Sequence, residues 1–107
     1  MQRFGMVIRV RPGAEQEFKR YHVAVWPEVL SIVRECNIGN YSVYLKNEFL
    51  FSYFEHHGAD FKADMARMGA DPAAQRWGAI MGTLQDPLPT RRPGEWLAEM
   101  EEVFHAD

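Results

Sequence analysis

The fold is decided by the stretch "NYSVYLKNEFLFSYFE", residues 40–55, in which large side chains recur at every second position on both sides of a short polar segment. A period of two is that of a β-strand, whose successive side chains point to opposite faces of a sheet. The polar segment Lys46-Asn47-Glu48 has the composition of a tight turn. The stretch therefore predicts a β-hairpin within an antiparallel sheet. Its alternating positions are Tyr41, Val43 and Leu45 before the turn and Phe49, Phe51, Tyr53 and Glu55 after it.

Upstream of the hairpin, the pattern predicts one strand and then a broken helix. Residues 3–13, "RFGMVIRVRPG", alternate in the manner of a strand and end on a Pro-Gly turn signal. From residue 14 the apolar spacing changes to three and four, which is the period of an α-helix. Pro27 has no N–H for an interior helical bond, so we expect two helical pieces, with Pro27 in the first turn of the second. Asn37 and Gly39 are expected to end the second piece.

Downstream of the hairpin, we expect two helices, a long loop and a last strand. Asp60 is the expected cap of a short helix, and Asp71-Pro72 begins another. Residues 85–96, "QDPLPTRRPGEW", hold three of the six prolines and predict an extended loop across a surface of this chain or of a partner. Residues 97–105, "LAEMEEVFH", are expected to form the final strand.

The resulting order of elements is β-α-β-β-α-β, which is the order of the ferredoxin-like α+β fold. We expect one domain over residues 1–107, built on an antiparallel four-stranded sheet with its helices on one face. The other face carries Phe, Tyr and Met side chains, which should not stay in contact with water. A homodimer that covers this face, in the manner of a dimeric α+β barrel, is therefore expected.

Composition and charge exclude several classes of partner. The net charge is −3 and no basic run is longer than Arg91-Arg92, so nothing favours a nucleic-acid partner. No stretch approaches the roughly 20 apolar residues of a membrane span, so we expect no membrane partner. The single cysteine, Cys36, allows no internal disulfide. Together with an N-terminus that lacks a secretory signal, this favours a cytoplasmic location.

Among the reactive side chains, one histidine stands out. Cys36 is expected to be a buried structural thiol. His56 and His57 would point opposite ways on an extended chain, so we expect a solvated loop there and no metal site. His22 lies on an apolar stripe with Trp26, near the C-terminal end of the first helical piece, where the helix dipole favours an imidazolium. It is either a packed core residue or a group that exchanges protons near neutral pH.

Aromatic side chains make up 13% of the chain. Such residues most often fill a core. They also form sugar pockets, because apolar ring faces stack on the C–H faces of a pyranose. Composition favours a role of these residues in the core, and a sugar pocket is the alternative.

The chain resembles the L-rhamnose mutarotase family over nearly its whole length. The matching stretches are "RPGAEQEFKRYH" (11–22), "WPEV" (26–29), "NYSVYL" (40–45), "QRW" (75–77) and "MEEVFH" (100–105). The resemblance implies a dimeric α+β barrel that interconverts the α and β anomers of a 6-deoxy-hexose. It implies no cofactor and no metal, and its partners are a small sugar substrate and a second copy of the chain.

The resemblance also implies the residues of a site. His22 stands where the family has its general acid, and Tyr41 stands where a tyrosine contacts the sugar. Trp77 is the first member of an aromatic pair that lines the pocket. Trp26 and Tyr44 are expected to complete the walls.

Two positions depart from the family pattern. Gly78 stands at the second position of the aromatic pair, and Phe18 stands where the family tends to have a tyrosine. A lost hydroxyl removes a hydrogen bond worth about 0.5–1.5 kcal/mol net. Both changes bear on which hydroxyl stereochemistry fits, so L-fucose is expected as a rival to L-rhamnose.

Other functions remain open on the same residues. The dimeric α+β barrel also carries haem degradation and cofactor-free oxygenation of aromatic substrates, and a non-catalytic small-ligand-binding module is a further alternative. The second acid–base group is also open: a carboxylate such as Glu55 or Glu102, a tyrosine hydroxyl or water could serve.

Overall fold

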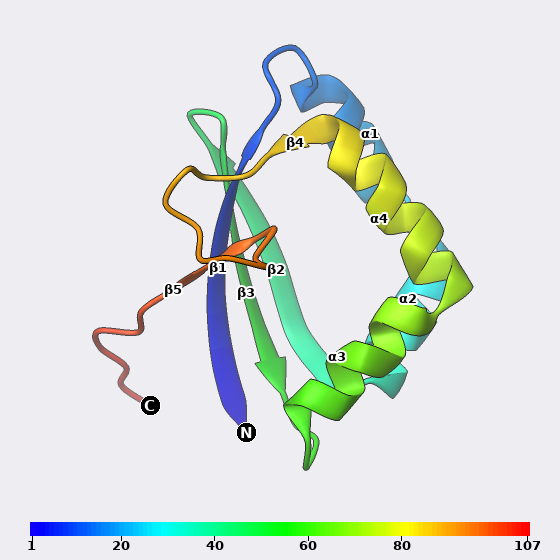
Figure 1. The fold of residues 1–107 in the computed structure, drawn as a ribbon, viewed down its shortest axis with the longest axis vertical. Helices are drawn as coiled ribbons and strands as arrows, with labels where there is room; N and C mark the ends of the chain where they lie inside the picture. The colour runs from blue at the N-terminus through cyan, green and yellow to red at the C-terminus, as the bar shows by residue number, and fades with distance from the viewer.

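A curved antiparallel sheet with four helices on one side makes up the computed structural model, which describes all residues 1–107 (Figure 1). The helices and strands follow one another as β1 (Gln2–Val10), α1 (Glu15–Val23), α2 (Pro27–Glu35), β2 (Ile38–Lys46), β3 (Phe49–His56), α3 (Phe61–Ala70), α4 (Pro72–Leu84), β4 (Gln85–Asp86) and β5 (Ala98–Met100). The expected α+β class and antiparallel sheet are confirmed, whereas the expected number of four strands is wrong, because the two-residue strand β4 adds a fifth. None of the helices is long and apolar enough to cross a bilayer.

The sheet has the order β2-β3-β1, and β4 and β5 share the remaining edge of β1. The expected final strand over residues 97–105 is wrong in its extent, because only Ala98–Met100 pairs with β1 and residues 101–107 have no regular structure. Beyond Met100, the chain is held by the Arg3 guanidinium, which donates hydrogen bonds to the Glu102 carboxylate at 2.9 and 3.1 Å. A side-chain ion pair thus takes the place of the backbone ladder there.

Local sequence signals explain the helix boundaries. Pro27 is the first residue of α2, so the break after α1 falls where its missing N–H predicts it. The carboxylates of Asp60 and Asp71 cap α3 and α4, accepting hydrogen bonds from backbone N–H groups at 3.1 and 2.9 Å. Asn37, with φ of 65°, follows α2, whereas Gly39 lies inside β2 and was wrongly expected to end the helix.

The hairpin of β2 and β3 closes through Asn47 and Glu48, whose φ angles of 51° and 71° give the left-handed backbone of a tight two-residue turn. A β-bulge lies near the start of β2, between Gly39 and Ser42, where two residues face one residue of β3. The extra residue changes the alternation of β2. As a result Ile38, which pairs with the buried His56, and Tyr41, which stacks on Phe54, both face the helices.

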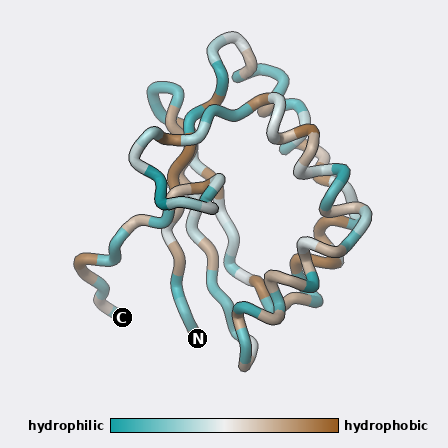
Figure 2. The backbone as a smooth tube through the Cα atoms, in the orientation of Figure 1, coloured by the Kyte–Doolittle hydropathy of each residue, from teal (hydrophilic) through white to brown (hydrophobic).

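The sheet has one face toward the helices, here called the inner face, and one face without helices, the outer face (Figure 1). The main core packs between the inner face and α1 and α4, and the apolar positions of the helices recur turn by turn (Figure 2). The core cluster consists of Ile8, Val10, Phe18, Leu50, Met81 and Leu84. The outer face leaves large apolar side chains exposed, among them Tyr44 at 65% and Met100 at 38%.

Candidate functional site

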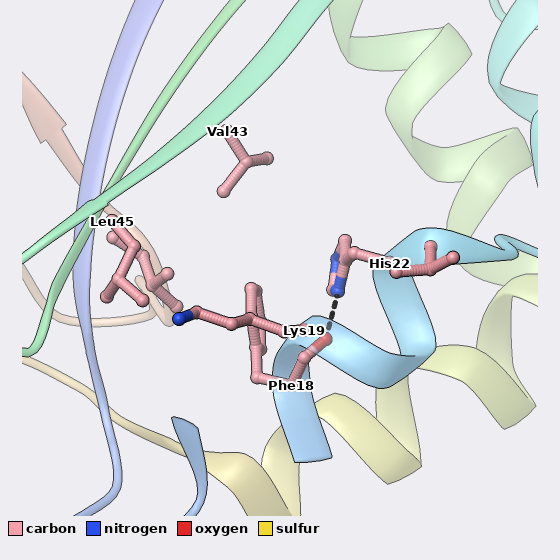
Figure 3. A pocket seen from close by; sticks show the side chains of 7 residues that line it. Phe18, Lys19, His22, Val43 and Leu45 are labelled. Atoms are coloured by element: carbon pink, nitrogen blue, oxygen red, sulfur yellow. Dashed lines mark hydrogen bonds between the residues drawn. The ribbon is translucent and has the colours of Figure 1, made fainter. Parts of the chain in front are cut away.

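A cavity of about 400 Å³ lies between α1 and the inner face of the β2–β3 hairpin (Figure 3). Its lining is mostly apolar, and the two side chains with polar ends are those of His22 and Lys19. An apolar cavity of this size with a few polar groups is typical of a small-molecule site. The lining residues are Phe18, Lys19, His22, Val23, Val43, Leu45 and Leu50.

The imidazole of His22 is held in one orientation by its own helix. Its Nδ1–H donates to the backbone carbonyl of Phe18, one turn earlier, at 2.9 Å (Figure 3). Since a carbonyl can only accept, the proton of the neutral ring is on Nδ1 and Nε2 carries a free lone pair. The ring also stacks on the Phe18 ring, with centroids 4.1 Å apart and planes at 23°. His22 therefore presents a fixed imidazole with one unused nitrogen.

Trp77 of α4 contacts aromatic residues of α1 and of the start of α2. Its ring meets the His22 ring edge-on at 5.4 Å, and it makes similar contacts with Trp26 at 5.1 Å and Tyr21 at 5.9 Å. Trp26 is the N-cap residue of α2, just before Pro27, so it lies at the break between α1 and α2. The structure therefore brings Trp26 and Trp77 together next to His22, although neither lines the 400 Å³ cavity itself.

Tyr41 extends the inner face beyond the cavity. It precedes Val43 on the same face of β2 and stacks on Phe54, with ring centroids 5.5 Å apart. The residue is 48% exposed, yet burial raises the pKa of its hydroxyl, because the surrounding protein desolvates the phenolate. Protein atoms therefore surround the hydroxyl, while other parts of the residue stay accessible to solvent. Tyr41 is therefore a neutral donor and acceptor beside the cavity.

Two expected wall residues are not brought to this cavity. Tyr44 pairs with Phe51 across the hairpin and lies on the outer face, opposite to Val43 and Leu45. Gly78 is exposed on α4, and a Cβ added there would meet no atom within 4 Å. Successive residues of a helix are about 100° apart, so Gly78 does not share the face of Trp77. Within one chain, neither position forms a wall next to His22.

The carboxylates considered as partners also lie elsewhere. Glu55 is on the outer face, where it accepts hydrogen bonds from Asn40 at 3.0 Å, Tyr53 at 2.7 Å and His57 at 3.1 Å. The Asn40 amide, followed by the Tyr53 hydroxyl, lowers the pKa of Glu55. Glu102 is bound by Arg3. No carboxylate lines the cavity of His22.

The expectation of a solvated loop at His56 and His57 is wrong for His56. It is the last residue of β3 and is 1% exposed, whereas His57 is half exposed. The His56 Nε2–H donates to Asp64 at 2.7 Å, and the Asn37 amide donates to the same oxygen at 3.0 Å. These contacts, the Asn37 amide first, lower the pKa of Asp64. The cluster joins α3 to the ends of α2 and β3.

A second cavity, of about 490 Å³, lies on the outer face beneath the C-terminal segment. It is larger than the cavity of His22, but most of its polar side chains are already engaged, and Glu101 is the exception. Arg3 binds Glu102 at 2.9 Å and Tyr53 donates to Glu55 at 2.7 Å. We therefore place the candidate site in the smaller cavity, where the nitrogen of a histidine is free.

Lys19 is a polar residue of the cavity that the sequence patterns did not single out. Its side chain extends from α1 toward the sheet, and its ammonium group lies 3.5 Å from Glu15 (Figure 3). The spacing of three residues between Lys19 and His22 places both on one side of α1, and this spacing was the available signal.

The structure is an α+β fold with an apolar cavity that contains a histidine, which makes the cavity a candidate small-molecule site. A sequence profile described as L-rhamnose mutarotase matches residues 3–106. The chain belongs to the L-rhamnose mutarotase family.

Individual relatives span the whole chain. It is 32% identical over 111 residues to an L-rhamnose mutarotase of Sinorhizobium fredii, with 98% of each chain covered. It is 32% identical over 109 residues to one of Opitutus terrae, with both chains fully covered. A crystal structure of an L-rhamnose mutarotase from Formosa agariphila, 19% identical, superposes over all of both chains with a TM-score of 0.78. This structure supports the fold.

Proposed function

We propose that this protein is an aldose mutarotase that interconverts the α and β anomers of L-rhamnose. Membership of the family supports this activity. The observation that carries the proposal is the imidazole of His22, which is tied at Nδ1 and free at Nε2 inside an apolar cavity. We propose His22 as the catalytic residue.

The proposed mechanism needs only proton transfer. Nε2 of neutral His22 takes the proton from the anomeric O1–H, and the ring C1–O5 bond breaks as the C1–O1 carbonyl forms. The imidazolium then protonates O5, which is within reach because O1 and O5 are bonded to the same carbon. The aldehyde rotates about its C1–C2 bond, and the same steps in reverse close the ring on the other face. A positioned acid–base group contributes roughly 10²–10⁴-fold in rate.

The other cavity residues fit a deoxy-sugar. Val43 and Leu45 offer apolar contact to a methyl group and to the C–H faces of the ring. Lys19 supplies a cation on the same helix as His22, suited to hydrogen-bond the sugar oxygens or to stabilise negative charge on O1. Tyr41 and Trp77 are proposed to contact the sugar outside the cavity lining. Because Phe18 stands where the family tends to have a tyrosine, L-fucose is proposed as a second substrate beside L-rhamnose.

Saturation-transfer NMR tests this function directly. Irradiation of the α-anomer H1 signal reduces the β-anomer signal only when the two exchange faster than they relax. We expect added protein to produce this transfer for L-rhamnose, and a heat-denatured sample to produce none. An absence of transfer with folded protein would refute the activity. A haem absorbance band or quinol-dependent oxygen consumption would instead indicate the oxygenase alternative.

We further propose that the protein is a homodimer in which the outer faces of two sheets pack together as a dimeric α+β barrel. Tyr44, Phe51 and Met100 are exposed on this face at 65%, 37% and 38%. The C-terminal segment adds Val103 and Phe104, each more than 80% exposed. Sedimentation analysis should give twice the chain mass, and Phe51→Glu should shift it toward one chain. A monomeric wild type would refute this arrangement.

The proposed setting of the reaction is the cytoplasm. Cys36 is the one cysteine, and it is free and fully buried, so the fold needs no oxidising compartment. Fractionation of producing cells, with detection of the protein in each fraction, tests this location.

A further inference from the structure

Ser52 is a hydroxyl in the middle of an otherwise apolar part of the inner face. Cross-strand partners share a face of a sheet, so the pairing of Ser52 with Val43, which lines the cavity, places Ser52 on the inner face of β3. Ser52 lies next to the lining residues Val43 and Leu50 and is not itself one of the lining residues. The residue is 7% exposed. Its neighbours on this face are Leu50 and Phe54 along β3, Val43 on β2 and Met6 on β1.

The hydroxyl of Ser52 has no hydrogen-bond partner among the side-chain bonds of the protein. It is also not one of the fully enclosed polar atoms that lack a partner, which are Arg9 Nε and His56 Nδ1. The oxygen must therefore still border open space. That space lies on the inner face, where Tyr41 and Val43 of the adjacent strand remain 48% and 37% exposed although they face the helices.

We infer that Ser52 is a specificity-determining residue, whose hydroxyl forms a hydrogen bond with one ring hydroxyl of the sugar. This inference rests on the proposed mutarotase function and adds a substrate contact to the same site. Serine can donate and accept at once, as a sugar hydroxyl can. A buried polar group left unpaired costs free energy, so a sugar without a hydroxyl in the matching position binds less well.

The geometry assigns the contact to a part of the sugar away from C1. His22 approaches from α1 on the helix side of the cavity, whereas Ser52 belongs to the sheet on the opposite side. We assign the contact to the hydroxyl on C2 or on C4 of a sugar whose anomeric carbon lies at His22. Ser52 is held by a central strand with neighbours on both sides, so its position is well fixed.

The test uses four 6-deoxy-L-hexoses that differ only at C2 and C4: L-rhamnose, 6-deoxy-L-glucose, 6-deoxy-L-talose and L-fucose. Anomer exchange is measured by saturation-transfer NMR for wild type, Ser52→Ala and Ser42→Ala. Ser42 is the matched control, because it is a serine on the neighbouring strand with its side chain on the outer face. We expect Ser52→Ala to lower kcat/KM about two- to tenfold for the sugars with one configuration at C2 or C4, and to leave their epimers unchanged. Ser42→Ala should preserve the wild-type ratios.

Several results would overturn the inference. Equal loss for all four sugars would show a structural effect, and unchanged ratios would show no contact. If Ser52→Ala does not fold, Ser52→Cys keeps the side-chain size with a much weaker donor and must show the same selective loss. If wild type exchanges none of the sugars, the mutarotase proposal fails separately. Calorimetric binding of the same four sugars to wild type and Ser52→Ala then decides whether Ser52 still discriminates between epimers.

Discussion

Substitution of His22 separates the chemistry of the site from its packing. His22→Ala removes the proposed acid–base group, and we expect anomer exchange to fall roughly 10²–10⁴-fold, toward the rate in water. His22→Phe removes the same nitrogens but keeps an aromatic ring between Phe18 and Trp77. Both variants should lack catalysis, and they should differ in stability.

The difference in stability follows from the contacts of the ring. His22→Ala loses the stacking on Phe18 and the edge contact with Trp77, each worth about 0.5–1.5 kcal/mol beyond burial. It also loses the Nδ1 hydrogen bond, worth about 0.5–1.5 kcal/mol. Together these contacts amount to roughly 1.5–4.5 kcal/mol, below the 5–15 kcal/mol of a typical native state. His22→Ala should therefore fold with a clearly lower unfolding midpoint, whereas His22→Phe should lose only the hydrogen bond.

The assay combines saturation-transfer NMR on L-rhamnose with urea unfolding followed by circular dichroism. His105→Ala is the control histidine, since His105 lies in the exposed C-terminal segment. Wild-type exchange in folded His22→Phe would refute a catalytic imidazole at this position. Equal unfolding midpoints for wild type and His22→Ala would refute the packing estimate.

Three further substitutions test neighbouring features of the molecule. Phe18→Tyr adds a hydroxyl to the cavity lining and should change the ratio of L-rhamnose to L-fucose exchange rates by about two- to tenfold, the range of one net hydrogen bond; an unchanged ratio would show that the Phe18 ring edge does not reach the sugar. Lys19→Met keeps the aliphatic stem but removes the cation, and should slow exchange about two- to tenfold; a similar effect of Lys62→Met, on exposed α3, would contradict a local role. The lowered pKa of Asp64 means that its contribution to stability is present above the ordinary carboxyl pKa of about 3.9 and is lost as the pH falls through the lower folded value. The urea midpoint of Asp64→Asn should therefore change less than that of wild type between pH 5 and pH 2.5, and equal changes would contradict this role.

Local signals determined most of the elements. The alternation around the hairpin, the break at Pro27 and the caps at Asp60 and Asp71 each act within a few residues, so sequence patterns predict them well. The missed features depend on contacts between distant segments. The segment that follows β5 is held by the ion pair of Arg3 with Glu102, 99 positions apart along the chain.

The same difference between local and long-range contacts applies to the candidate site. The helical period predicts that His22 and Phe18 lie one turn apart on α1, whereas the place of Trp77 beside them follows only from the family resemblance, because it is a contact between two distant helices. Tyr44 could have been rejected from sequence, because alternation places it on the face opposite to Val43. Burial of His56 was not predictable in this way, since its partner Asp64 lies on the next helix and its environment exists only after α3 packs on the sheet.

The β-bulge in β2 also constrains how the length of this strand can vary. Loss of one of the two bulge residues between Gly39 and Ser42 would restore plain alternation and leave Ile38 and Val43 on the same face. Loss of both residues would send one end of the strand to the opposite face. Variants and homologues that keep a working inner face should therefore lose only one residue at this position, whereas a loss of two should be absent.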